Sequence, residues 1–216
     1  MRDSPSINSR IREIRDRMAK AAHRCGRQPR EVRLMAATKH AAVEQIRDAI
    51  ASGIGLIGEN YVQDAAQKSP QLPQVEKHFI GSLQSNKVKL AVKLFDCIQS
   101  VDSLRLAKEI DKAALEQNKA MPVFIEINPG EESKGGVPFG DAGALYNQMV
   151  KLPHIKIRGL MGIAPLHGDA RAFFRRMKKT ADELGLKELS MGMSDDFEIA
   201  IEEGSTMVRV GRALFA

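Results

Sequence analysis

Short apolar runs alternate with longer amphipathic stretches along the 216-residue chain, and this alternation restricts the fold more than any other feature. The runs are rich in Val, Ile, Leu and Met, as expected of buried strands, and there are about eight of them. They cover residues 32–38, 55–59, 78–82, 97–101, 123–128, 157–163, 188–193 and 207–210. Helical stretches lie between them, for example at residues 43–52, 104–118, 142–150, 170–184 and 196–203.

This order of elements predicts parallel strands joined by right-handed helical crossovers. About eight such units predict closure into a single (β/α)8 TIM barrel rather than an open sheet. A dinucleotide-binding open sheet is disfavoured because no Gly-x-Gly-x-x-Gly motif follows the first strand. No low-complexity linker interrupts the pattern, so we expect residues 1–216 to form one domain.

The net charge of +6 is confined to one end of the chain. Residues 1–33 hold ten basic and four acidic residues, and the rest of the chain is balanced. Apolar residues recur there at helical spacing, which predicts an amphipathic helix at about residues 6–25. We interpret its arginines as the solvated outer face of a helix packed on the barrel. Binding of RNA or of acidic partners is the alternative, disfavoured because no aromatic residues interleave with the charges.

Two further features limit the class of protein. No apolar run approaches the roughly 20 residues that a membrane helix needs, and the N-terminus lacks the apolar core of a signal peptide, so we expect a cytoplasmic protein. Cys25 and Cys97 lack the spacing of metal ligands, so we expect buried free thiols and no metal site.

Several residues with useful chemistry fall at or just past predicted strand ends. Lys39, Asn60, Ser194 and Gly211 all do so, and the carboxyl ends of the strands converge on one rim of such a barrel. Arg209 alternates with two valines on the last strand, so we expect its side chain to point inward. Position alone also permits simpler roles: a solvated lysine, a turn asparagine, a helix N-cap at Ser194 and a turn glycine.

Together these residues indicate a site for a phosphorylated aldehyde. A lysine amine at a strand's carboxyl end can form an imine with an aldehyde. Turns that contain Ser and Gly can offer backbone N–H groups to a phosphate. Pyridoxal phosphate has both groups.

Five segments closely resemble those of the pyridoxal phosphate homeostasis protein family, and the resemblance spans nearly the whole chain. They are Ala37-Thr38-Lys39, Gly58-Glu59-Asn60-Tyr61, residues 78–87, Ser190-Met191-Gly192-Met193-Ser194, and residues 204–212. The resemblance implies a single barrel similar to the N-terminal domain of alanine racemase, the fold type III of pyridoxal phosphate proteins. It also implies a monomer that stores pyridoxal 5'-phosphate for vitamin B6 homeostasis or delivers it to dependent apoenzymes.

The same resemblance implies the roles of the site residues. Lys39 would hold the cofactor as a Schiff base, and Asn60 would make a polar contact near it. Ser194, Gly211 and the backbone of Arg212 would bind the phosphate. Arg209 would face the pyridine nitrogen, where an arginine disfavours protonation of the ring and so makes it a poorer electron sink.

The chain departs from the family pattern at two loops and resembles it at a third. The family continues Lys-x-x-Pro, whereas Lys39 is followed by His40-Ala41-Ala42, and the connection at residues 165–173 is shorter than usual. Residues 128–136 resemble the family's flexible loop after the fifth strand. Lys134 in that loop has two open interpretations, contact with a second phosphate or a simple exposed lysine.

Two interpretations of the activity remain. A carrier without catalysis leads, because alanine racemase also uses a tyrosine acid/base and a second β domain, and we expect neither here. Neither Tyr61 nor Tyr146 has a predicted position opposite Lys39. A small racemase-like enzyme with the same cofactor is the alternative. We expect His78 to be a structural residue at the barrel's lower rim.

Overall fold

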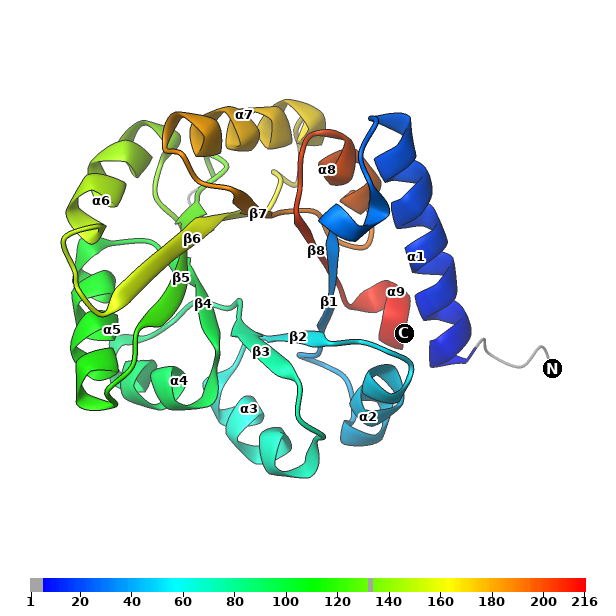
Figure 1. The fold of residues 1–216 in the computed structure, drawn as a ribbon, viewed down its shortest axis with the longest axis horizontal. Helices are drawn as coiled ribbons and strands as arrows, with labels where there is room; N and C mark the ends of the chain where they lie inside the picture. Colours follow the sequence, from blue (N-terminus) through cyan, green and yellow to red (C-terminus); the bar gives the residue numbers. More distant parts are fainter. Residues whose placement is uncertain (1–5, 132–133) are drawn as a thin grey trace.

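The computed structural model describes residues 6–131 and 134–216 and shows a closed barrel of parallel strands surrounded by helices (Figure 1). The strands follow one another around the barrel in sequence order, from β1 to β8, and β8 pairs with β1. The predicted (β/α)8 barrel is therefore confirmed.

The strands are β1 Arg33–Ala37, β2 Leu56–Glu59, β3 Glu76–Phe79, β4 Cys97–Val101, β5 Met121–Ile127, β6 Ile155–Gly162, β7 Glu188–Ser190 and β8 Met207–Val210. Four predicted ranges were wrong by at least two residues at an end: β5 and β6 each begin two residues earlier than predicted, and β3 and β7 also differ. The third strand begins at Glu76 because the lower barrel mouth is open to water and accepts charged side chains there. The seventh ends at Ser190, shortly before Gly192 turns the chain at a φ of 94°.

The helices are α1 Ile7–Arg24, α2 Val43–Ala51, α3 Val62–Lys68, α4 Val88–Leu94, α5 Leu104–Glu116, α6 Ala142–Met149, α7 Ala170–Glu183, α8 Phe197–Glu202 and α9 Arg212–Phe215. Short 3-10 turns occur at Pro29–Glu31, Ser69–Gln71, Ser85–Lys87 and Phe139–Asp141. The predicted cap at Ser103 is confirmed, since its side chain accepts a hydrogen bond from the Leu106 N–H at 3.3 Å.

Most of the apolar core lies between the strands and the ring of helices. One large cluster lies under α3 to α7, and a smaller one lies under α1, α2, α8 and α9. The inside of the barrel is different, because it contains both a small apolar cluster of Met35, Leu56 and Met207 and several buried polar side chains. These polar groups include His78, Gln99, Ser190 and Arg209.

Helix α1 packs beside α8 and α9 on the outside of the barrel (Figure 1). Its apolar face, which includes Ile11, Ile14 and Met18, is buried as predicted. Two of its arginines pair with carboxylates of α8, Arg17 with Glu198 at 2.9 Å and Arg24 with a second glutamate at 2.7 Å. Part of the basic face is thus neutralised within the fold.

The two cysteines differ in exposure. Cys97 is buried inside the barrel beside Phe124 and Met161, as expected. Cys25 is exposed, so the expectation of a buried thiol was wrong there. It lies at the C-cap of α1, where its thiol reaches back to the carbonyl oxygen of Ala22 at 3.2 Å.

None of the helices in the described part of the chain has the length and apolar character required to cross a bilayer.

Candidate functional site

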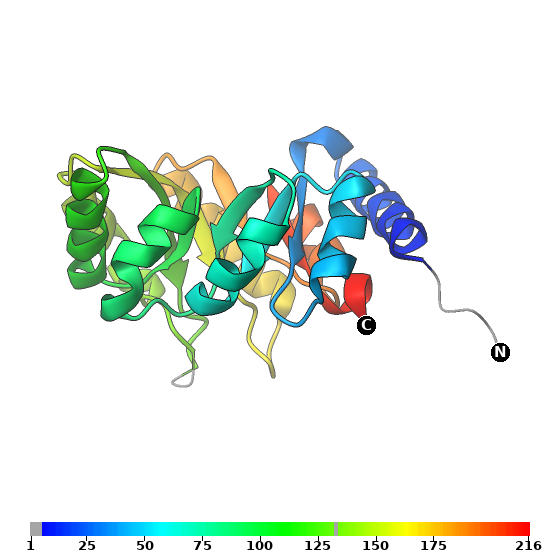
Figure 2. The same ribbon diagram turned by 90° about the horizontal axis from the view of Figure 1, so that it is seen from below.

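A cavity of about 610 Å³ opens at the carboxyl ends of the strands. Figure 2 shows this rim at the lower edge of the molecule, where α9 lies and the loop after β6 projects. All six candidate residues line the cavity: Lys39, Asn60, Ser194, Arg209, Gly211 and Arg212. Several apolar residues that were not predicted from the sequence also line it, among them Ile80, Ile163 and Phe215.

Lys39 is the first candidate residue past the end of β1, and its side chain is exposed at the cavity. The preceding residue, Thr38, is fully buried. Its backbone N–H donates to the carbonyl oxygen of Gly58 on β2 at 2.9 Å, which continues the pairing of the two strands. The amine of Lys39 is therefore accessible while its backbone is attached to a rigid strand.

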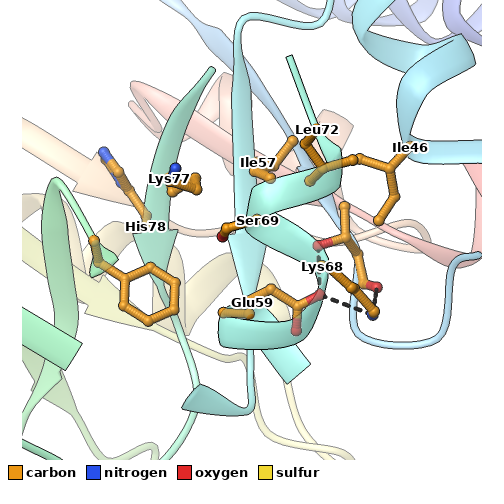
Figure 3. A pocket seen from close by; sticks show the side chains of 11 residues that line it. Ile46, Ile57, Glu59, Lys68, Ser69, Leu72, Lys77 and His78 are labelled. Atoms are coloured by element: carbon orange, nitrogen blue, oxygen red, sulfur yellow. Dashed lines mark hydrogen bonds and ion pairs between the residues drawn. The ribbon is translucent and has the colours of Figure 1, made fainter. Parts of the chain in front are cut away.

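A partly buried ion pair, in which Glu59 is buried and Lys68 is partly exposed, lies behind this strand end (Figure 3). The ammonium group of Lys68 donates to the carboxylate of Glu59 at 3.2 Å and to the carbonyl oxygen of Thr38 at 3.2 Å. The Thr38 hydroxyl donates to the same carboxylate at 2.7 Å. The pair thus connects the ends of β1 and β2, the strands that precede Lys39 and Asn60. Glu59 of the Gly58-Glu59-Asn60-Tyr61 motif therefore accepts these hydrogen bonds on the outer side of the barrel wall, not inside the cavity.

Asn60 is half-buried, and its backbone N–H donates to the Glu59 carboxylate at 3.2 Å. Its carbonyl oxygen lies against Gly81 so closely that a Cβ on that glycine would come within 2.2 Å of it. Only glycine leaves room for this approach. Neighbouring backbone therefore fixes the position of Asn60 at the cavity wall.

Ser194 and Gly211 lie on the two last loops. The N-cap interpretation of Ser194 was wrong, because α8 begins at Phe197 with Asp196 as its N-cap. Instead, the Ser194 hydroxyl accepts a hydrogen bond from the Ala213 N–H at 3.3 Å, which connects the two loops. Gly211 lies close to β1, since a Cβ there would be 3.0 Å from the Ala37 carbonyl oxygen.

The guanidinium group of Arg212 is exposed and pairs with Asp195. Its side chain is therefore occupied at the rim of the cavity, while its backbone lies beside Gly211. The expected contribution of the Arg212 backbone to the site stays a prediction.

Arg209 points into the barrel, as expected, and is 4% exposed. It donates to the Ser190 carbonyl oxygen at 2.5 Å, to the Ser190 hydroxyl at 2.8 Å and to the Gly162 carbonyl oxygen at 2.8 Å. Burial lowers the pKa of Arg209 to about 10, and the carboxylates of Glu126 and Asp196 oppose this shift. The group therefore stays charged at neutral pH.

Glu126 is a largely buried carboxyl near Arg209 that the sequence argument missed. Burial raises its pKa to about 7, Arg209 opposes the shift, and Asp102 adds to it. Its position follows from the alternation of β5, in which Ile125 and Ile127 face the helices while Phe124 and Glu126 face inward. That period of two in the sequence was the signal for it.

His78 also lies inside the barrel rather than at its lower rim. The strand begins two residues earlier than predicted, so His78 is its third residue and is 3% exposed. Its ring contacts Gln99 on β4 and Glu76 on its own strand.

The loops after β5 and β6 are joined. Lys134 donates to the Ala164 carbonyl oxygen at 2.8 Å and pairs with Glu131 at 3.1 Å, while the same glutamate accepts from the Leu166 N–H at 2.7 Å. Lys134 is thus a partly buried tether between loops, not a simple exposed lysine. Glu132 and Ser133, which belong to the loop predicted to resemble the family's flexible loop, lie outside the described residues.

The chain matches the family model described as the alanine racemase N-terminal domain over residues 9–216. Two relatives are named pyridoxal phosphate homeostasis proteins. The one from Aquifex aeolicus is 41% identical and the match covers 95% of this chain and 96% of the relative. The one from Escherichia coli K12 is 38% identical over 97% of this chain and 95% of the relative.

Solved structures show the same similarity. A protein of Bifidobacterium adolescentis described as unknown has 36% identity and a TM-score of 0.92, over 97% of this chain and 94% of that one. PipY of Synechococcus elongatus, solved with pyridoxal phosphate bound, has 36% identity and a TM-score of 0.86, over 98% and 100%. Alanine racemase of Clostridium difficile, at 15% identity and a TM-score of 0.74, shares the fold over 95% of this chain and 56% of its own length.

Proposed function

The chain belongs to the pyridoxal phosphate homeostasis protein family, and on this premise we propose that it binds pyridoxal 5'-phosphate as a Schiff base on Lys39. The cofactor is stored there or passed to dependent apoenzymes, and the protein does not act as a catalyst. A relative whose structure is solved with this cofactor bound, PipY, supports the choice of ligand.

The cavity suits the chemistry of this ligand. Its volume of about 610 Å³ is ample for a single small cofactor. Lys39 supplies a primary amine for the aldehyde, and the loops that carry Ser194 and Gly211 supply a hydroxyl and backbone N–H groups for the phosphate. Arg209 supplies N–H donors on the inner side, where the pyridine nitrogen needs a partner. When bound, the cofactor supplies an electrophilic aldehyde and an aromatic ring.

The observation that carries the proposal is that one cavity is lined by all six residues that the sequence predicts for the site. They come from the ends of β1, β2, β7 and β8, which are far apart in the chain. An amine, a charged guanidinium and two Ser- and Gly-bearing loops around one cavity are the complement of a phosphorylated pyridine aldehyde.

Two observations support storage rather than catalysis. Enzymes that need the ring as a strong electron sink place an acid against its nitrogen, whereas this site offers the charged Arg209; this disfavours such enzymes but not a racemase, because alanine racemase also works with an arginine. Neither tyrosine lines the cavity in the described part of the chain, and Tyr61 is 53% exposed. We expect amino acids to undergo no α-proton exchange above that seen with free pyridoxal phosphate, as measured by deuterium incorporation.

An absorbance experiment tests the assignment of Lys39. Adding pyridoxal phosphate to the purified protein should produce a visible imine band, which Lys39→Ala should abolish. Lys187→Ala is the matched control, because Lys187 is an exposed lysine just before β7 at the opposite rim and should leave the band unchanged. A full band in the Lys39→Ala variant refutes the assignment.

Delivery requires a second measurement. We expect the loaded protein to restore activity to a pyridoxal-phosphate-dependent apoenzyme in the presence of a trap for free cofactor. If the trap prevents the apoenzyme from regaining activity, the cofactor is transferred only after its release into solution, and storage remains as the function. We further propose that the protein acts as a cytoplasmic monomer, which cell fractionation and sedimentation equilibrium test.

A further inference from the structure

A continuous chain of hydrogen-bonded side chains crosses the inside of the barrel from its lower mouth to Arg209. At the lower end, Glu76 pairs with Arg33 and contacts the His78 ring at 2.8 Å. The other ring nitrogen lies 2.7 Å from the side-chain nitrogen of Gln99. Interaction with His78 and Arg33 lowers the pKa of Glu76 to about 2, so this end of the chain is a fixed carboxylate.

The upper half of the chain connects Gln99 to the cofactor cavity. The Ser190 hydroxyl donates to the amide oxygen of Gln99 at 2.6 Å, and Arg209 donates to the same hydroxyl at 2.8 Å. All three side chains are at least 96% buried, because their exposures are 0%, 0% and 4%. The residues come from β4, β7 and β8, so the chain spans the barrel interior.

The donors and acceptors fix one direction for every hydrogen in the chain. Arg209 only donates, so the Ser190 hydroxyl accepts from it and must place its own hydrogen on the Gln99 oxygen. The Gln99 NH₂ group then faces Nδ1 of His78 and the sulfur of Met207, which lies at 3.2 Å. Nδ1 therefore accepts, and the ring carries its hydrogen on Nε2, which donates to the Glu76 carboxylate.

The reversed arrangement leaves groups unpaired. If Gln99 turned its amide over, its NH₂ would donate to Ser190, and the Ser190 hydrogen would have no acceptor opposite Arg209. The amide oxygen would then face the thioether sulfur of Met207 and Nδ1 of His78. Nδ1 would have to carry a hydrogen in order to donate to it. Buried unpaired polar groups cost about 1–3 kcal/mol each, so the observed direction is strongly preferred.

The hydrogen bonds that Arg209 makes to the protein determine which of its N–H groups remain for a ligand. Both hydrogens on Nη1 are used by Ser190, one on its carbonyl oxygen and one on its hydroxyl. One hydrogen on Nη2 is used by the Gly162 carbonyl oxygen. The second Nη2 hydrogen and the Nε hydrogen have no acceptor among the described residues, and Arg209 lines the cavity.

We propose that Ser190 and Gln99 are positioning residues that hold the Arg209 guanidinium in one orientation, and that His78 fixes Gln99 in turn. The role follows from the chain of contacts, since Gln99 and His78 do not line the cavity. This inference deepens the proposed function and depends on it only in the part that concerns the bound cofactor.

The first test uses the cofactor-free protein, so it does not depend on cofactor binding. Nitrogen-15 NMR of the histidine rings should show His78 with its hydrogen on Nε2 and a bare Nδ1. Rotation of the Arg209 guanidinium about its Cζ–Nη bonds, measured by NMR exchange, should be at least about tenfold faster in Ser190→Ala and Gln99→Leu, since each loses about one charge-assisted hydrogen bond or its support. Gln99→Glu should instead place a hydrogen on Nδ1 of His78, because a carboxylate only accepts.

Ser205→Ala is the matched control. Ser205 is equally buried, and its hydroxyl bonds to backbone carbonyl oxygens of β7 and its neighbours but not to Arg209. Its loss should leave the rotation of Arg209 unchanged. The proposal is overturned if the rotation of Arg209 is accelerated equally in Ser205→Ala. It is also overturned if the rotation is accelerated in neither Ser190→Ala nor Gln99→Leu. A wild-type His78 with its hydrogen on Nδ1 alone overturns it as well.

The second test uses the loaded protein. A released Arg209 no longer keeps the pyridine nitrogen unprotonated, and a positive ring lowers the pKa of the attached imine. The pH at which the visible band disappears should therefore fall by about one unit in Ser190→Ala and Gln99→Leu, but not in Ser205→Ala. An unchanged titration with altered Arg209 rotation overturns the effect on the cofactor. Absence of the band in the wild type contradicts the proposed function alone.

Discussion

Replacing Glu126 with glutamine should change the pH dependence of stability. Relative to the wild type, the free energy of unfolding of the variant should increase as the pH rises. Glu126 lies inside the barrel, where its carboxylate approaches Gly135, and no side-chain hydrogen bond to it occurs among the described residues. Burial raises its pKa from 4.5 to about 7. The folded protein therefore prefers the protonated carboxyl.

The sign and size follow from proton linkage. The folded state binds more protons than the unfolded state between the two pKa values, so the free energy of unfolding falls as the pH rises. The stabilisation from the neutral carboxyl is complete below about pH 4.5 and is lost as the pH rises through about 7. A shift of about 2.5 units corresponds to about 3 kcal/mol in total. Glutamine has a similar shape and does not titrate, so the variant lacks this term.

The assay is urea unfolding of the cofactor-free protein and of Glu126→Gln at several values from about pH 4.5 to about pH 8.5. Subtracting the two free energies at each pH removes every other titrating group. The difference should move by about 3 kcal/mol in favour of the variant as the pH rises, with its midpoint between about 5 and 7. A difference that is independent of pH would refute the reasoning, as would a change in favour of the wild type, which requires a carboxylate stabilised by Arg209.

Three further changes should alter stability or binding. Lys68→Met leaves the Glu59 carboxylate buried without its partner and should lower the free energy of unfolding by about 3 kcal/mol in urea titrations. Gly81→Ala forces a Cβ to within 2.2 Å of the Asn60 carbonyl oxygen and should cost about 2 kcal/mol and weaken cofactor binding, whereas Gly140→Ala, with open space around it, should not. Ser194→Ala removes one hydroxyl donor and should weaken cofactor binding by about tenfold in fluorescence titrations, with an unchanged affinity counting against a phosphate contact.

The barrel and the location of its site were predictable because they depend on local patterns. Apolar runs separated by amphipathic stretches leave few alternatives to parallel strands with helical crossovers. Once a barrel is expected, residues just past strand ends such as Lys39 and Asn60 must lie at one rim. The alternation of β8 likewise predicts that Arg209 points inward.

The polar interior was not predictable, because its contacts join residues distant in sequence. Gln99 and Ser190 are separated by 91 positions, and nothing in either neighbourhood indicates the other. The start of β3 was predicted two residues too late because Glu76 and Lys77 are charged, and charged residues are typical of loops. They are tolerated in the strand because it begins at an open barrel mouth. The sequence allowed Ser194 to cap α8, whereas its hydroxyl accepts from the Ala213 N–H of α9, a partner that lies after β8 and 19 positions away.

The most direct test of the proposed function is to reduce the cofactor-loaded protein with borohydride and locate the modified residue by mass spectrometry. Reduction converts an imine into a stable secondary amine, so the lysine that held the aldehyde keeps a pyridoxyl phosphate group. We predict that the peptide containing Lys39 carries this group and that Lys39→Ala carries it nowhere in comparable yield. A tag on another lysine, or no tag at all, would contradict the assignment of this cavity as the cofactor site.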